Sequence, residues 1–217
     1  MKQKQSNMKK IILSLLLICA ASVSVTAATD DSKYLSGAVP EENGVITFKK
    51  SFSVPGKSAE EVRATMQLFV NTLVDNSIPA PGNYARIMED NNEEGIVARI
   101  CEWLVFKKKP LNLDRARFRY QIQVTTQGNR VNIVLNNISY YYNEDMETQN
   151  GVIIKAENWI SDSEALNKAK TKLYPKSGKF RRKTVDRAEE IFNEAMDAFV
   201  VKENKPAVPA RNGIVVE

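Results

Sequence analysis

The chain has 217 residues, with 31 lysines and arginines, 26 aspartates and glutamates, and no histidine, and its formal net charge is +5. Without histidine, neither a Ser-His-Asp triad nor a Cys-His pair can form, and the most common zinc ligand is missing. The sequence has no G-x-S-x-G, G-x-G-x-x-G or P-loop pattern. We therefore expect no metal site and no cofactor, and any catalysis would have to use carboxylates, lysine, tyrosine or cysteine.

Residues 1–27 have the pattern of a secretory signal peptide. Two adjacent lysines precede the apolar run of residues 11–21, and small residues follow it. The apolar run is too short for a stable membrane anchor, and we expect cleavage after Ala27, with Ala28 as an alternative. The sequence thus predicts an exported protein of the periplasm or cell envelope, or one outside the cell, with no transmembrane segment after cleavage.

The two cysteines bear on processing and chemistry. Ile18 precedes Cys19, where a lipid-modifying peptidase requires a small residue, so we favour simple cleavage over lipidation. Cys101 then remains alone and cannot form an intrachain disulfide. It lies in a β-prone apolar segment and has no histidine to activate it, which predicts a buried structural thiol.

Signal cleavage also changes the charge. It removes four lysines and no acid, so 27 basic residues remain against 26 acids and the net charge falls to +1. A nearly neutral mature chain argues against a nucleic-acid partner.

The rest of the chain predicts one domain over residues 44–201. Residues 28–43 are polar and acidic and are expected to form a flexible leader. Residues 202–217 contain two prolines and little periodicity, which indicates a tail.

Alternating apolar residues predict the strands of this domain. The expected strands are residues 44–54, 84–90, 95–106, 117–125 and 130–142, with a basic loop at 107–113, a hairpin turn at Gln127-Gly128-Asn129 and a bulge near Asn136-Asn137. The bulge is expected because the apolar phase of the last strand shifts by one residue there.

Two capping boxes predict helix starts. The first, Ser58 to Glu61, begins a helix with an apolar stripe. The second, Ser161 to Glu164, is expected to begin a short helix to about Tyr174. Residues 175–178 should break it, and residues 184–201 form a strongly amphipathic helix.

This order of elements predicts an α+β fold with two layers. An antiparallel sheet of about five strands would be covered on one face by helices, and its other face would be wet. The predicted common core contains Phe118, Tyr120, Ile122, Val131, Ile133, Leu135, Phe192 and Phe199.

Four segments of the chain resemble a known family. They are residues 44–54 with Pro55-Gly56-Lys57-Ser58, then Phe118-Arg119-Tyr120, then Asn136-Asn137-Ile138-Ser139-Tyr140, and Gly178-Lys179-Phe180-Arg181-Arg182-Lys183-Thr184. The family comprises exported bacterial domains of unknown function with a TATA-box-binding-protein-like fold. The resemblance covers about residues 44–201 and implies that fold. Because the family has no established activity, it implies no functional residues.

A basic and polar platform on the wet sheet face is the main candidate site. Antiparallel pairing should gather Arg99, Arg117, Arg119, Gln121 and Gln123 there. Such a surface could hold an anionic glycan, a phosphate-bearing polymer or an acidic envelope protein. The alternative is a solvated face whose arginines pair with nearby carboxylates.

Three other motifs favour structural roles. The run Lys179-Phe180-Arg181-Arg182-Lys183 resembles a nucleic-acid patch, but near a helix N-terminus its charge should be compensated by acids or a docking surface. In Tyr140-Tyr141-Tyr142, the first and third residues follow the apolar phase of the strand and should line the core. The acid pairs Glu60-Glu61, Glu93-Glu94 and Glu189-Glu190 lie in a cap, a turn and a helix face.

The leading hypothesis is a non-enzymatic binding or assembly module of unknown ligand. The alternative is a histidine-free hydrolase that works with carboxylates, which would need two carboxyl groups at hydrolase spacing in a deep cleft. A shallow basic sheet face would favour binding instead.

Overall fold

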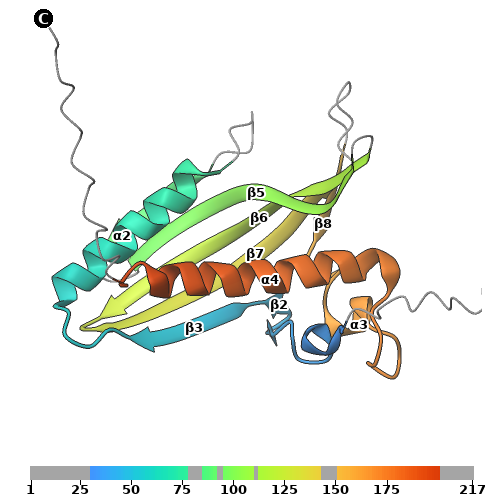
Figure 1. Ribbon diagram of the computed structural model, residues 1–217, viewed down its shortest axis with the longest axis horizontal. Helices are drawn as coiled ribbons and strands as arrows, with labels where there is room; N and C mark the ends of the chain where they lie inside the picture. Colours follow the sequence, from blue (N-terminus) through green and yellow to red (C-terminus); the bar gives the residue numbers. More distant parts are fainter. Residues whose placement is uncertain (1–29, 78–84, 92–94, 110–111, 143–150, 201–217) are drawn as a thin grey trace, which may run out of the picture. The chain divides into compact units, whose positions relative to one another are not determined.

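An antiparallel sheet with two long helices on one face forms the domain (Figure 1). The computed structural model describes residues 30–77, 85–91, 95–109, 112–142 and 151–200. The predicted signal peptide and C-terminal tail lie outside these residues. The main elements are β3 (Phe48–Ser53), α2 (Ala59–Asp75), β4 (Arg86–Asn91), β5 (Gly95–Lys109), β6 (Asn112–Gln127), β7 (Arg130–Tyr142), β8 (Val152–Lys155) and α4 (Pro175–Asp197). The small elements are η2 (Ser32–Tyr34), β1 (Glu41–Glu42), β2 (Val45–Ile46) and α3 (Asp162–Ala165).

The strand order is β3-β7-β6-β5-β4, and β8 pairs with a second part of β7. The predicted α+β class and the single helix-covered face are confirmed. The sheet has six strands rather than about five, because β8 is absent from the sequence-based expectation. Three of the four β8 residues are exposed, so the strand has no apolar alternation that would reveal it.

The core lies between the helices and the even-numbered residues of β6. Phe118, Tyr120 and Ile122 of β6 are at most 2% exposed and join α2 and α4 in one cluster. All eight predicted core residues belong to this core, with Phe199 packed against it partly buried. The predicted Ser58 capping box is also confirmed: Ser58 Oγ accepts from the Glu61 amide, and Glu61 accepts from the Ser58 amide.

The predicted bulge in β7 is confirmed. Arg119 of β6 pairs with Ser139, but two residues later Gln121 pairs with Asn136, so β7 has one extra residue here. Asn137 has a φ of 51°, a left-handed conformation that asparagine tolerates better than most residues. The bulge restores Ile138 to the buried face after Leu135.

Two predicted breaks in regular structure are wrong. Within residues 107–113, predicted as a loop, β5 continues to Lys109 and β6 begins at Asn112. Helix α4 begins at Pro175, before the predicted start at residue 184, because proline is well tolerated in the first turn of a helix. Gly178, predicted as a breaker, packs within the helix: a Cβ there would lie 2.8 Å from Leu173 Cβ.

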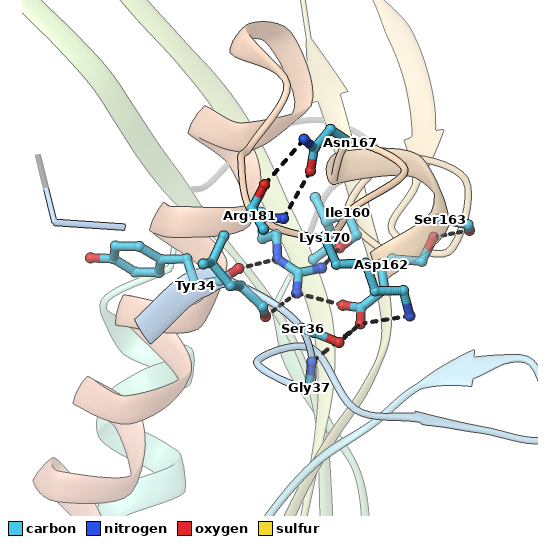
Figure 2. Close-up of polar contacts among 12 residues, drawn as sticks. Tyr34, Ser36, Gly37, Ile160, Asp162, Ser163, Asn167, Lys170 and Arg181 are labelled. Atoms are coloured by element: carbon cyan, nitrogen blue, oxygen red, sulfur yellow. Dashed lines mark hydrogen bonds and ion pairs between the residues drawn. The ribbon is translucent and has the colours of Figure 1, made fainter. Parts of the chain in front are cut away.

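The predicted flexible leader over residues 28–43 is corrected from Ser32 onward. The segment packs against α4, and Val39 within it is 5% exposed. Figure 2 shows the anchor: Arg181 of α4 donates to the carbonyl oxygens of Tyr34 (2.6 Å) and Leu35 (2.7 Å) and to Asp162 Oδ1 (2.6 Å). Composition gave no sign of this, because the partner lies about 150 residues away in the chain.

The second predicted capping box is also wrong. Ser161 makes no side-chain cap hydrogen bond, and α3 has only four residues. Leu166 is already extended and pairs with Leu173. Asp162 instead accepts hydrogen bonds from Arg181, Ser36 and the amide of Gly37 (Figure 2).

Candidate functional site: the open face of the sheet

The sheet face opposite α2 and α4 gathers the predicted platform residues. Across β5 and β6, Arg99 pairs with Gln121, and the next rows pair Cys101 with Arg119 and Trp103 with Arg117. Gln123 lies one row to the other side, opposite Val97. Arg99 is exposed and the other four platform residues are partly exposed. The structure therefore brings all five together, and their binding role stays a prediction.

Two aromatic rings lie among these arginines. Arg115 Cζ is 3.7 Å from the centre of the Trp103 ring, and Arg117 Cζ is 5.4 Å from the same ring. On the neighbouring strand, the Tyr141 ring is 5.9 Å from Arg117 Cζ and 5.4 Å from Arg119 Cζ. We call these five residues the basic–aromatic patch. Each cation–π contact contributes about 0.5–1 kcal/mol when exposed and about 2 kcal/mol when desolvated.

Aromatic rings, rather than carboxylates, accompany several of these cations. Within the described residues, Arg99, Arg115 and Arg119 form no ion pair. The Nε atom of Arg119 is buried without a hydrogen-bond partner there, and a buried unpaired donor costs about 1–3 kcal/mol. This arrangement disfavours the alternative in which local carboxylates neutralise the whole platform.

Cys101 faces the same side of the sheet but is buried. It is 3% exposed, beside Arg119 in the cross-strand register. Burial raises the pKa of its thiol above the ordinary value, and the nearby charges of Arg119 and Arg117 oppose that shift without reversing it. The predicted buried strand thiol is confirmed, and a thiolate nucleophile is disfavoured.

Part of the basic run of α4 is internal. Lys179 Nζ lies 2.6 Å from Asp114 Oδ2 and donates to the Tyr142 hydroxyl at 2.7 Å. Phe180 is 1% exposed, and Arg181 is fully buried and pairs with Asp162. The expected compensation by acids is confirmed for Lys179 and Arg181. Phe180 and Arg181 therefore belong to the interior of the fold rather than to its surface.

The tyrosine run divides as predicted. Tyr140 is fully buried and shares a 2.7 Å hydrogen bond with Thr184 of α4. Tyr142 packs against the core partly buried, whereas Tyr141 belongs to the open face.

The acid pairs occupy separate places. Glu60-Glu61 begins α2, Glu189-Glu190 lies on the exposed side of α4, and Glu93-Glu94 lies outside the described residues. In the described part of the chain, no three histidine, cysteine, aspartate or glutamate residues are grouped to hold a metal ion. No helix in the same ranges is long and apolar enough to cross a membrane.

A cavity of about 490 Å³ adjoins the patch, in the interval between β3 and β8 along the edge of β7. We call it the edge cavity. Its polar lining includes Asn137 and Ser139 of β7, Lys155 of β8, and Glu157 and Asn158 just after β8. Ser139 connects the two features, because it pairs with Arg119 on one side and Lys155 on the other.

The sequence indicated only part of this surface. Trp103 lies four residues after Arg99 on the same strand, so it belongs to the same predicted face. Its stacking on arginines, however, depends on the register between β5 and β6. Lys155 could not be assigned, because the short exposed strand β8 gives no periodic signal.

Comparison with known proteins identifies relatives that share this fold. Residues 48–141 match a family model described as a domain of unknown function (DUF4468) with a TBP-like fold. The crystal structure of a DUF4468 family protein from Bacteroides ovatus is 37% identical, has a TM-score of 0.71, and is matched over 82% of this chain and 100% of its own. A TBP-like protein from Parabacteroides distasonis, 18% identical with a TM-score of 0.60 over 76% of this chain and 98% of its own, shares the fold. No curated protein matches the chain. The chain therefore belongs to the DUF4468 family, a family of domains with a TBP-like fold and no assigned molecular function.

Proposed function

We propose that this protein is an exported, non-enzymatic module that binds an anionic partner through the open face of its sheet. The observation that supports this most directly is the basic–aromatic patch, in which three arginines surround two aromatic rings. Stacking uses the flat face of a guanidinium group and leaves its N–H donors for carboxylate or phosphate oxygens. Arg115 and Arg119 have no ion-pair partner in the described residues, so their charge is available to a ligand.

The composition of the patch is also more typical of a ligand-binding surface than of a surface that only keeps the protein soluble. Tryptophan, tyrosine and arginine are the residue types most enriched among the residues that dominate binding energies. Export is supported by the sequence pattern of residues 1–27.

Replacing Arg117 and Arg119 by glutamine tests the proposal. Each lost charge-assisted hydrogen bond should cost about 1.5–3 kcal/mol of binding free energy. The double variant should therefore bind oligogalacturonate or poly-L-glutamate at least tenfold more weakly in calorimetric titrations. Binding by the wild type should also weaken as salt increases.

The matched control replaces Lys168 and Lys172 by glutamine. Both lysines are exposed on the loop between α3 and α4, so this variant loses the same charge away from the patch. It should bind like the wild type. Equal affinity of the patch variant and the control would refute a role for the open face.

A further inference from the structure

The edge cavity offers a second, more selective set of contacts beside the basic–aromatic patch. We propose that it binds one sugar ring of an acidic saccharide, a ring that bears hydroxyl groups and a carboxylate. This inference deepens the proposed function and rests on it.

The cavity exists because two strands share one edge of β7. Strand β3 pairs with β7 as far as Leu135, opposite Phe48, and β8 pairs from Ser139, opposite Lys155. The bulge at Asn137 lies in the interval between them. Neither strand covers β7 there, and Gly44 and Val45 of the β1–β2 hairpin also line the hollow.

The lining offers several donors that bind no other group in the part of the protein that the structure describes. Within the described residues, the side chains of Ser139, Lys155 and Asn158 have no hydrogen-bond or ion-pair partner. An ammonium group, a hydroxyl and an amide therefore face a volume typical of small-molecule sites. The lysine supplies the positive charge that a carboxylate requires.

One acceptor distinguishes a hydroxylated ligand from a bare anion. Glu157 Oε1 accepts from the amide of Ile46 at 3.1 Å, which holds the carboxylate in the lining of the cavity. Its remaining acceptor capacity suits a sugar hydroxyl, which can donate a hydrogen bond, whereas a fully ionised sulfate has no donor to offer. The apolar side chains of Val45 and Ile153 also line the cavity and can pack against the C–H groups of a sugar ring.

The cavity and the patch can hold one extended ligand. Arg119, Ser139 and Lys155 lie opposite one another on three neighbouring strands. Two strand spacings separate Arg119 from Lys155, a backbone distance of about 10 Å. An acidic saccharide chain can therefore place one ring in the cavity and a neighbouring carboxylate at Arg119.

Titration of the full mature protein with three probes tests this inference. The probes are oligogalacturonate, neutral galacto-oligosaccharide and poly-L-glutamate, which carries carboxylates but no hydroxyls. The wild type should bind oligogalacturonate about tenfold more tightly than poly-L-glutamate. Lys155→Gln and Asn158→Ala should each remove most of this preference, with poly-L-glutamate affinity unchanged. Lys172→Gln, an exposed lysine outside both sites, is the matched control, and thermal melts verify that each variant is folded.

The outcomes separate this inference from the proposed function. If both polyanions bind equally and only the Arg117 and Arg119 variant weakens them, the saccharide cavity is refuted and the anion-binding face stands. Tighter binding of the neutral sugar would refute the acidic ligand. If the wild type binds none of the probes, both the anion-binding role of the open face and the saccharide site in the edge cavity are refuted.

Discussion

Replacing Arg181 by methionine should detach the N-terminal segment from α4. The guanidinium group is fully buried and donates to the carbonyl oxygens of Tyr34, Leu35 and Ile160 and to Asp162, at 2.6–2.7 Å (Figure 2). Methionine has a long flexible side chain but no donor. The substitution therefore leaves three carbonyl groups and one carboxylate without their main partner.

The expected cost follows from what can replace these bonds. Removing one partner of a buried ion pair costs about 3–5 kcal/mol. The side chain of Asp162 is 23% exposed and keeps hydrogen bonds from Ser36 Oγ (2.9 Å) and the Gly37 amide (3.2 Å). Water can reach this carboxylate, so we expect a loss near the lower end, about 3 kcal/mol.

Urea unfolding of the wild type and the variant measures this loss. The control is Lys183→Met, an exposed position on the same helix, which should change stability by less than about 0.5 kcal/mol. Limited proteolysis at Lys33 reports separately on the docking of the N-terminal segment. A loss below about 1 kcal/mol, with Lys33 still protected, would show that Arg181 does not hold this segment in place.

Three further outcomes are expected. Burial raises the pKa of Asp162, but hydrogen bonds from Arg181, Ser36 and Gly37 outweigh burial and place it below the ordinary value. Its contribution to stability is therefore complete above about pH 4 and is lost as the pH falls through the lower folded-state pKa, and Asp162→Asn should flatten that part of the acid unfolding curve. Phe192→Ala should cost about 3–5 kcal/mol, because Phe192 joins α4 to the sheet core at 8% exposure, and an unchanged thermal melt would contradict this packing. Mass spectrometry of the native protein should find Ala28 or Thr29 at the N-terminus without a lipid, whereas an acylated Cys19 would contradict the predicted cleavage.

Local patterns predicted the sheet because its strands are half-buried. In β6 every second residue from Phe118 to Val124 faces the core, so period-two alternation reveals both the strand and its open face. The one-residue shift between Leu135 and Ile138 predicted the bulge for the same reason. These signals depend only on neighbours in the chain.

Contacts between distant segments could not be predicted in the same way. Arg181 lies in a run of cations, and the pattern of the run is the same for a solvated surface as for a buried ion pair. Its partners come from residues 34–35 and 160–162, which only the tertiary fold brings together. The edge cavity likewise depends on where β3 and β8 end along β7, which no local pattern encodes.

The two faces of the sheet use their cations differently, and this difference bears on function. On the helical side, Lys179 pairs with Asp114 and Arg187 with Glu102. Removing either cation would leave a carboxylate without its ion-pair partner and should lower stability. On the open side, removing Arg119 leaves no carboxylate of the described residues without an ion-pair partner. It also removes a buried Nε donor that has no hydrogen-bond partner within those residues. The fold therefore gains little from this arginine, and proteins often keep such unfavourable groups where binding requires them. The Arg119→Gln single variant should thus remain nearly as stable as the wild type while it loses affinity for the anionic probes, and a merely structural patch would not produce that combination.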